Sequence, residues 1–193
     1  MRKIIFPAFL IVLIACDSTN EKDAKERKSK QEEVFPVAYF FQEQIRMVDS
    51  LKLPTVKIIV SGGQTLTEAI SMEEFKSLAL EFINSDISDP SLKNAYEESS
   101  FADQSIPSVT ITYSTDDTTL PVRRLDVIID PDPVRNDQVK SVYIEKLVKH
   151  SDTTVVKKLY WKANENFQVI TSNNIPGSKP VVSQLKVSWN GMN

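Results

Sequence analysis

The sequence predicts an α+β fold in which N-terminal helices pack on a curved, roughly six-stranded antiparallel meander sheet with a small hairpin at one edge. Two observations indicate this class. Apolar residues recur at helical spacing after residue 34, and from about residue 105 several segments alternate between apolar and polar residues. Because the helices precede the strands and short links join the strands, we expect helices segregated from an antiparallel sheet.

The first sixteen residues form the first distinct segment. Arg2 and Lys3 precede an uncharged run from residue 4 to residue 15, which is shorter than the about 20 apolar residues of a membrane-spanning helix. This size is typical of the apolar part of a secretory signal peptide. The sequence LIAC, which ends in Cys16, resembles the lipobox of bacterial lipoprotein precursors. An ordinary secretory signal with a chance cysteine is the alternative.

The lipobox resemblance implies a signal peptide over residues 1–15, transfer of a diacylglyceryl group to the Cys16 thiol, cleavage before Cys16 and acylation of the new amine, with palmitate as a typical acyl chain. Several acyl chains together give a stable membrane anchor, whereas one chain binds reversibly. Cys16 is therefore the expected lipid attachment site, and the membrane is the expected partner of its acyl chains.

Residues 16–33 are expected to be the acylated cysteine followed by a disordered, charged tether. Six acidic and five basic side chains follow Cys16 in this segment, and Ala24 is its one apolar side chain. Such a segment buries too little surface to offset its ordering entropy. As a flexible coil it spans about 20–25 Å. A charged helix with pairs such as Glu21–Lys25 is the alternative.

The rest of the chain, residues 34–193, is expected to be a single α+β domain that begins with a helix. Phe35 and Pro36 begin this helix and Leu53-Pro54 ends it. Residues 55–70 contain two β-rich runs around a Gly-Gly turn, which predicts a hairpin. The apolar face of the helix comprises Ala38, Phe41, Ile45 and Val48.

Two further helices are expected before the sheet. Ser71 begins a capping box in which the serine accepts a hydrogen bond from the backbone and Glu74 reaches back. That helix should end near Asn84, and Asp89-Pro90 should start a short third one. The inward-facing side chains are expected to be Phe75, Leu78, Ala79 and Phe82 on the second helix, and Leu92, Ala95 and Tyr96 on the third.

Six strands with turn-forming links are expected after the helices, and their apolar face needs a cover that the helices supply. We therefore expect the concave side of the sheet to wrap around the helices. The predicted strands are Ser108–Ser114, Val122–Asp130, Gln138–His150, Thr153–Ala163, Asn166–Ser172 and Val181–Trp189.

The composition of the 193 residues argues against several kinds of site. One histidine and one cysteine are too few for a usual zinc site or for a disulfide within the chain, and four glycines are too few for a glycine-rich phosphate loop. Without residues 1–15 the chain keeps 21 basic and 26 acidic side chains, a net charge of −5. We expect no nucleic-acid partner, no metal and no cofactor.

The candidate catalytic and ion-binding residues all have an ordinary explanation. His150 lies in a predicted turn where Asp152 and a serine would complete a catalytic arrangement, but an exposed turn histidine is the expected reading. Three acidic pairs lack the spacing and the glycine of a calcium loop. We expect them to lie in turns and at helix ends, and we expect no catalytic residue. The pairs are Glu97-Glu98, Asp116-Asp117 and Asp130 with Asp132.

Five more side chains concern possible binding surfaces. Arg123 and Arg124 point to opposite faces of their predicted strand, so only one of them can line a given surface. Trp161 and Trp189 fall on the core face. Tyr160 points the other way, where helix cover or ordinary surface is expected, and an exposed aromatic patch with Lys158, Lys162 and Ile170 is the alternative.

Taken together, the segments named below resemble a group of uncharacterised lipoproteins of Bacteroidota, each with a short lipobox signal and one domain of this size. The resemblance implies no activity and no site residues. It rests on Phe35-Pro36-Val37, on residues 96–104 (YEESSFADQ), on residues 158–163 (KLYWKA), on Phe167-Gln168-Val169 and on residues 185–189 (LKVSW).

These observations predict a membrane-anchored lipoprotein of the cell envelope that acts as a non-enzymatic binding or interaction module. Its partner is an envelope protein of unknown identity. A carrier or sensor of a lipid or other apolar ligand in the concave sheet is the first alternative, and a hydrolase that uses His150 is the second. We expect the outer membrane facing the periplasm as its location, with the inner membrane and the cell surface as alternatives.

Overall fold

The computed structural model describes residues 34–103, 105–131 and 138–190, and the structural statements below concern these residues. The signal peptide predicted over residues 1–15, the lipid attachment predicted at Cys16 and the tether predicted up to residue 33 lie outside them. The residues from Val34 onward form one compact unit. The α+β class is confirmed, with two α-helices and one antiparallel sheet in the described residues.

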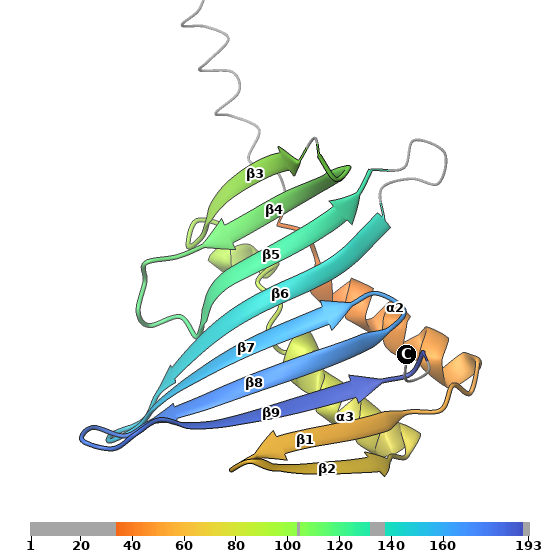
Figure 1. The fold of residues 1–193 in the computed structure, drawn as a ribbon. Helices are drawn as coiled ribbons and strands as arrows, with labels where there is room; N and C mark the ends of the chain where they lie inside the picture. The colour runs from red at the N-terminus through yellow and green to blue at the C-terminus, as the bar shows by residue number, and fades with distance from the viewer. Residues whose placement is uncertain (1–33, 104, 132–137, 191–193) are drawn as a thin grey trace, which may run out of the picture. The chain divides into compact units, whose positions relative to one another are not determined.

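The sheet has nine described strands in the order β2-β1-β9-β8-β7-β6-β5-β4-β3, so the predicted number of six is wrong (Figure 1). From β3 to β9 each strand pairs with the next one along the chain, and the predicted meander is confirmed. The strands are β1 Val56–Ser61, β2 Gln64–Ala69, β3 Glu97–Asp103, β4 Ser108–Ser114, β5 Val122–Asp130, β6 Gln138–Lys149, β7 Thr154–Lys162, β8 Asn166–Asn174 and β9 Val181–Ser188.

The predicted hairpin is confirmed as β1 and β2, and it lies at an edge of the sheet. Gly62 and Gly63 have φ values of 57° and 78°. Positive φ at both central residues is what a tight two-residue hairpin turn requires, and glycine adopts it without steric cost. The hairpin is continuous with the main sheet because β1 pairs along its length with β9. This pairing accounts for two of the additional strands.

The third additional strand, β3, was not predicted because its sequence EESSFAD does not alternate between apolar and polar residues. It is a strand because it pairs with β4 along its whole length, from Glu97 opposite Ser114 to Asp103 opposite Ser108. It forms the second edge of the sheet and its side chains are almost all exposed. Acidic side chains on such an edge discourage pairing with another chain.

The two α-helices, α2 (Val37–Ser50) and α3 (Met72–Ile83), lie on the same face of the twisted sheet (Figure 1). This face is called the inner face below, and the opposite face is called the outer face. The predicted third helix is only a turn of 3₁₀-helix, η1 (Pro90–Leu92). Asp89 caps it by accepting a hydrogen bond from the backbone N–H of Ser91 at 2.8 Å.

The start of α3 bears out half of the predicted capping box. The Ser71 hydroxyl accepts a hydrogen bond from the backbone N–H of Glu74 at 3.2 Å. The Glu74 carboxylate binds Lys57 of β1 instead of reaching back to the backbone of Ser71. Glu74 turns to Lys57 because an ammonium group within reach is a stronger partner for a carboxylate than a neutral backbone N–H.

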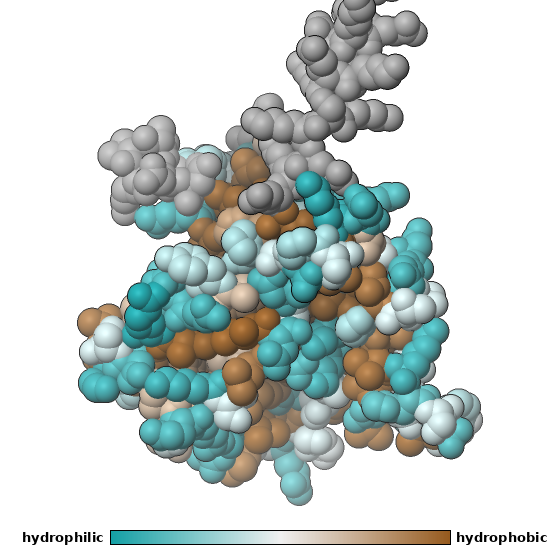
Figure 2. All heavy atoms as spheres, turned by 180° about the vertical axis from the view of Figure 1, so that it is seen from behind, coloured by the Kyte–Doolittle hydropathy of each residue, from teal (hydrophilic) through white to brown (hydrophobic). Residues whose placement is uncertain are grey.

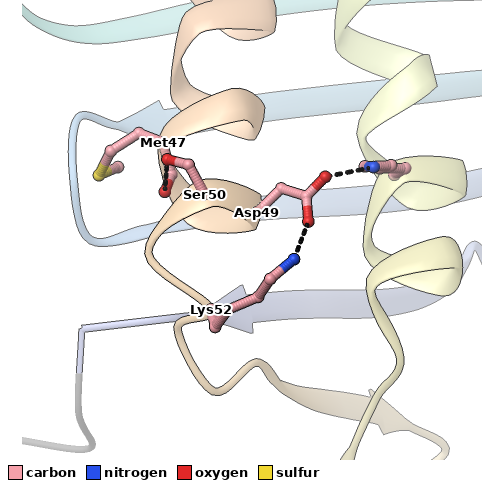
Figure 3. Close-up of polar contacts among 5 residues, drawn as sticks. Met47, Asp49, Ser50 and Lys52 are labelled. Atoms are coloured by element: carbon pink, nitrogen blue, oxygen red, sulfur yellow. Dashed lines mark hydrogen bonds and ion pairs between the residues drawn. The ribbon is translucent and has the colours of Figure 1, made fainter.

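One acidic side chain near the end of α2 links the two helices. Asp49 accepts hydrogen bonds from Lys52, at 3.1 Å in the turn that follows α2, and from Lys76 of α3 at 2.7 Å (Figure 3). These hydrogen bonds, that of Lys76 first, hold the pKa of Asp49 below its ordinary value. The link is exposed, so it contributes little to the stability of the fold.

An aromatic cluster fills the space between the helices and the middle of the inner face. Its members are almost completely inaccessible to solvent, and the ring centroids of Phe82 and Trp161 are 5.0 Å apart. The predicted core positions of Trp161 and Trp189 are confirmed. This part of the interior therefore leaves no room for a ligand. The cluster comprises Phe41, Phe75, Phe82, Trp161, Phe167 and Trp189.

Candidate binding groove

Cross-strand register arranges the inner face in three parallel rows of side chains. The aromatic row contains Val142, Trp161, Phe167, Val187 and Lys57. The aliphatic row contains Ile144, Leu159, Val169, Leu185, Ile59 and Leu66. The polar row contains Lys146, Lys157, Thr171, Ser183 and Ser61. The inner face thus changes from aromatic to aliphatic to polar along the strands.

A groove of about 600 Å³ lies between α3 and the aliphatic and polar rows. This volume is within the range of pockets that hold small molecules, roughly 300–1,000 Å³. The groove is called the inner groove below. Its lining comprises Ser77, Leu78, Leu80, Glu81 and Asn84 of α3, Lys57 and Ile59 of β1, Lys146 of β6, Lys157 of β7, Val169 and Thr171 of β8, and Ser183, Gln184 and Leu185 of β9.

The inner groove has an apolar floor. Val169 is 9% exposed, Leu185 and Ile59 are partly exposed beside it, and Leu80 of α3 is half exposed on the helix side. Figure 2 looks at the helix-covered side of the molecule and shows hydrophobic side chains at the surface between hydrophilic ones. The aliphatic row continues to Leu66, which is 53% exposed at the edge of the sheet. Apolar surface therefore runs from the groove to that edge.

A cluster of three charged side chains closes one end of the inner groove. Lys146 and Lys157 are directly opposite each other on β6 and β7. Glu81 of α3 binds both lysines. Its Oε1 accepts a hydrogen bond from Lys146 at 2.7 Å, and its Oε2 accepts one from Lys157 at 2.7 Å. Two like charges opposite each other repel, and a single carboxylate cancels only one of them. The cluster keeps a net charge of +1.

The surroundings of Glu81 shift its pKa in two opposing ways. Burial raises the pKa, but the hydrogen bonds from Lys146 and Lys157 outweigh burial and hold the pKa below its ordinary value of 4.5. Glu81 is therefore ionised at neutral pH. The carboxylate stays between the two lysines as the partner that both of them share.

Lys57 forms a second charged cluster at the other side of the inner groove. Its ammonium nitrogen is 2.6 Å from Glu68 and also binds Glu74. The hydrogen bonds to Glu68 and then to Glu74 raise the pKa of Lys57. One cation with two carboxylates gives a net charge of −1. Three strand spacings, about 14 Å, separate β1 from β7, so the groove is polarised between these two clusters.

The structure places His150 in the exposed turn between β6 and β7, where its backbone N–H donates to the carbonyl of Thr153 at 2.8 Å. Asp152 is also exposed in that turn, away from the inner groove. Within the described ranges, no three or more histidine, cysteine or carboxylate side chains come together as a metal site would require. Glu97 and Glu98 lie on strand β3, so their expected place in a turn or at a helix end is wrong. Asp132 lies outside these ranges.

The pairing of β5 with β6 shifts register between Val122 and Arg124, so the regular alternation that predicts opposite faces for Arg123 and Arg124 is interrupted at Arg123. Arg123 donates to the backbone carbonyl of Asp117, in the turn before β5. Arg124 is on the outer face and binds Asp126, with distances of 2.9 and 3.0 Å from its Nε to the two carboxylate oxygens. Both guanidinium groups thus have partners from neighbouring residues of the same chain.

Tyr160 lies on the outer face, which no described helix covers. It is directly opposite Tyr143 of β6. Burial first, and then the hydrogen bond that its hydroxyl donates to Glu145 at 3.0 Å, raise the pKa of Tyr143 to about 12. The outer face therefore carries a pair of tyrosines at this point, with Ile170 exposed two strands from Tyr143.

Sequence reasoning missed the charged cluster of the inner groove, although a signal for it was present. Trp161 falls on the core face of its predicted strand, and Lys157, four residues earlier, has the same parity. Lys146 likewise shares a face with Ile144. A lysine on the apolar side of a predicted strand calls for an anionic partner. Glu81 of α3 is that partner here.

Comparisons of the chain with protein-family models, with curated proteins and with solved structures gave no match. Among the described residues, no helix is both long enough and apolar enough to cross a membrane. The inner groove and its charged clusters are therefore interpreted from their own chemistry below.

Proposed function

We propose that this protein is a lipid-anchored binding protein of the bacterial cell envelope that holds an apolar small molecule in the inner groove and catalyses no reaction. The observation that carries the binding role is the groove itself, with a volume of about 600 Å³ and an aliphatic floor beside a filled aromatic core. Water at such a floor is released when an apolar molecule covers it, and this release drives binding.

The proposed anchor is supported by residues 1–16 of the sequence, where an uncharged run ends in LIAC. Lipidation at Cys16 would hold the folded body near a bilayer through the charged segment up to residue 33. Metabolic labelling with a radioactive palmitate precursor, followed by mass spectrometry of the mature N-terminus, tests this part. We expect label in the wild type and none in Cys16→Ser, whereas an unprocessed or unacylated N-terminus in the wild type contradicts the anchor.

The binding role is tested with a neutral apolar dye, N-phenyl-1-naphthylamine, whose fluorescence rises when it leaves water. Thr171→Trp places an indole in the polar row of the inner groove, and Ser172→Trp places one on the outer face of the same strand. We expect the wild type and Ser172→Trp to bind the dye equally and Thr171→Trp to bind it about tenfold more weakly.

The control excludes a general effect of an added indole, because residues 171 and 172 are neighbours on opposite faces of β8. Circular dichroism of both variants checks that they fold. Absence of dye binding to the folded wild type contradicts the proposed binding role, and so does equal binding by Thr171→Trp and Ser172→Trp.

A further inference from the structure

We propose that the natural ligand is a single-chain anionic amphiphile, whose head group binds Lys146 and Lys157 and whose tail lies along the aliphatic row. This inference rests on the proposed binding role of the inner groove and names the ligand class. The shared chemistry is one alkyl chain with a terminal anion, such as the carboxylate of a fatty acid or the phosphate of a monoalkyl ester.

The charge of the head group follows from the count of partners at the Lys146–Lys157 end. Each ammonium group has three N–H donors, and among the described residues each of these two groups contacts one acceptor oxygen, which Glu81 supplies. The Lys146 side chain is only 12% exposed and that of Lys157 is 29% exposed, so neither charge is freely hydrated. A ligand anion would take up unused donors and neutralise the remaining positive charge.

The direction of the ligand follows from the polarity of the inner groove. The Lys57 cluster, with Glu68 and Glu74, has a net charge of −1 and repels an anion. The Lys146–Lys157 end attracts it. A head group therefore has one preferred end of the groove, and the tail points toward β1 and β2.

The tail has a continuous apolar path in that direction. Val169, Leu185, Ile59 and Leu66 follow one another on β8, β9, β1 and β2 at directly paired positions. Three strand spacings make this path about 14 Å long. The half-exposed Leu80 of α3 borders it on the helix side. One alkyl chain fits this geometry, because the path is a single row of side chains.

Displacement of the neutral dye by four dodecyl compounds tests the inference. Dodecanoate and dodecyl phosphate are the two anionic arms, dodecanol is the neutral arm and dodecyltrimethylammonium is the cationic arm, all used below their micelle-forming concentrations. We expect the anions to displace the dye at about tenfold lower concentration than dodecanol. The cation should be the weakest of the four. The comparison of the two anionic arms tells a carboxylate from a phosphate.

Two substitutions give opposite expected effects. Lys157→Met leaves Glu81 paired with Lys146 and removes the excess positive charge, so we expect anion affinity to fall about tenfold while dodecanol is unaffected. Glu81→Gln removes the competing carboxylate and should raise anion affinity several-fold. Lys158→Met is the matched control, because it removes the same charge from the outer face of the same strand.

The outcomes separate the two proposals. If the dye binds in the inner groove but no dodecyl compound displaces it from the folded protein, the ligand class is wrong while the binding role stands; if the dye itself does not bind, both fail. If dodecanol displaces the dye as well as the anions do, or if Lys157→Met weakens dodecanol and dodecanoate equally, only the anionic head group is wrong. If Glu81→Gln does not fold, Lys157→Met and Lys158→Met decide the question.

Discussion

Lys146 and Lys157 stand directly opposite each other on adjacent strands and share one carboxylate, that of Glu81 on α3. This relationship ties the helix to the sheet by two charge-assisted hydrogen bonds. It also leaves an uncompensated positive charge at a point where apolar surface begins. The same three side chains therefore bear on the stability of the fold and on the chemistry of the inner groove.

Glu81→Gln should destabilise the protein at neutral pH by about 1–2 kcal/mol, because two lysines then face each other without a counter-charge. The pKa of Glu81 is lowered by folding, so its contribution is complete above the unfolded value of 4.5 and is lost as pH falls through the lower folded value. Urea unfolding from neutral pH to below 4.5 should show the wild-type and Glu81→Gln curves converging on acidification. Glu98→Gln, on the exposed edge strand, is the control. Curves that stay parallel would count against the assignment.

Phe41→Ala should cost about 3–5 kcal/mol, because it removes a ring that is completely buried in the aromatic cluster. Tyr39→Ala is the matched control on the same helix, since its ring is 64% exposed, and should change the free energy of unfolding by at most about 0.5 kcal/mol. Chemical denaturation of both variants measures the difference. Similar losses for the two substitutions would contradict the orientation of α2.

Ser71→Ala should cost about 1 kcal/mol, because the hydroxyl that caps the first turn of α3 is lost. Ser77→Ala makes the same chemical change at an exposed position inside α3. Alanine is the better helix former, so this control should be neutral or slightly stabilising. Thermal unfolding of the pair separates the cap from the helix propensity, and a loss of stability in Ser77→Ala alone would refute the assignment.

Lys76→Met should raise the pKa of Asp49 more than Lys52→Met does. The hydrogen bond from Lys76 is the largest cause of the lowered value, and that from Lys52 is the second. Carboxyl-carbon NMR titration of Asp49 in the two variants measures this order directly. Because Asp49 is at the surface, neither variant should show a large change in unfolding free energy. Equal pKa values in both variants would mean that the link between the helices is not formed in solution.

Alternation of apolar and polar residues was the best guide to the sheet. β4 and β5 begin and end where the sequence predicted, because the inner face demands an apolar residue at every second position. β3 buries almost none of its side chains, so its sequence needs no alternating apolar residues. Its strand conformation comes from pairing with β4. The number of strands was underestimated for this reason, and because the Thr55–Ile70 hairpin was treated as an addition to the sheet.

Local sequence patterns did not predict the inner groove, for a different reason. Glu81 meets Lys146 and Lys157 only when α3 lies across β6 and β7, and no spacing along the chain encodes that placement. The capping-box pattern at Ser71 was misleading in the same way, because Lys57 of β1 takes the carboxylate of Glu74. Local patterns predicted the elements, but tertiary charge pairs decided where the acidic side chains of α3 point.

The place of β9 has a consequence for how the chain folds. β9 is the last strand of the described residues, yet it lies inside the sheet between β1 and β8. Until β9 is in place, the early β1–β2 hairpin has no other strand to pair with, and an isolated hairpin is only marginally stable in water. The sheet is therefore completed only by pairing between strands that are far apart in the sequence, and such non-local pairing slows folding.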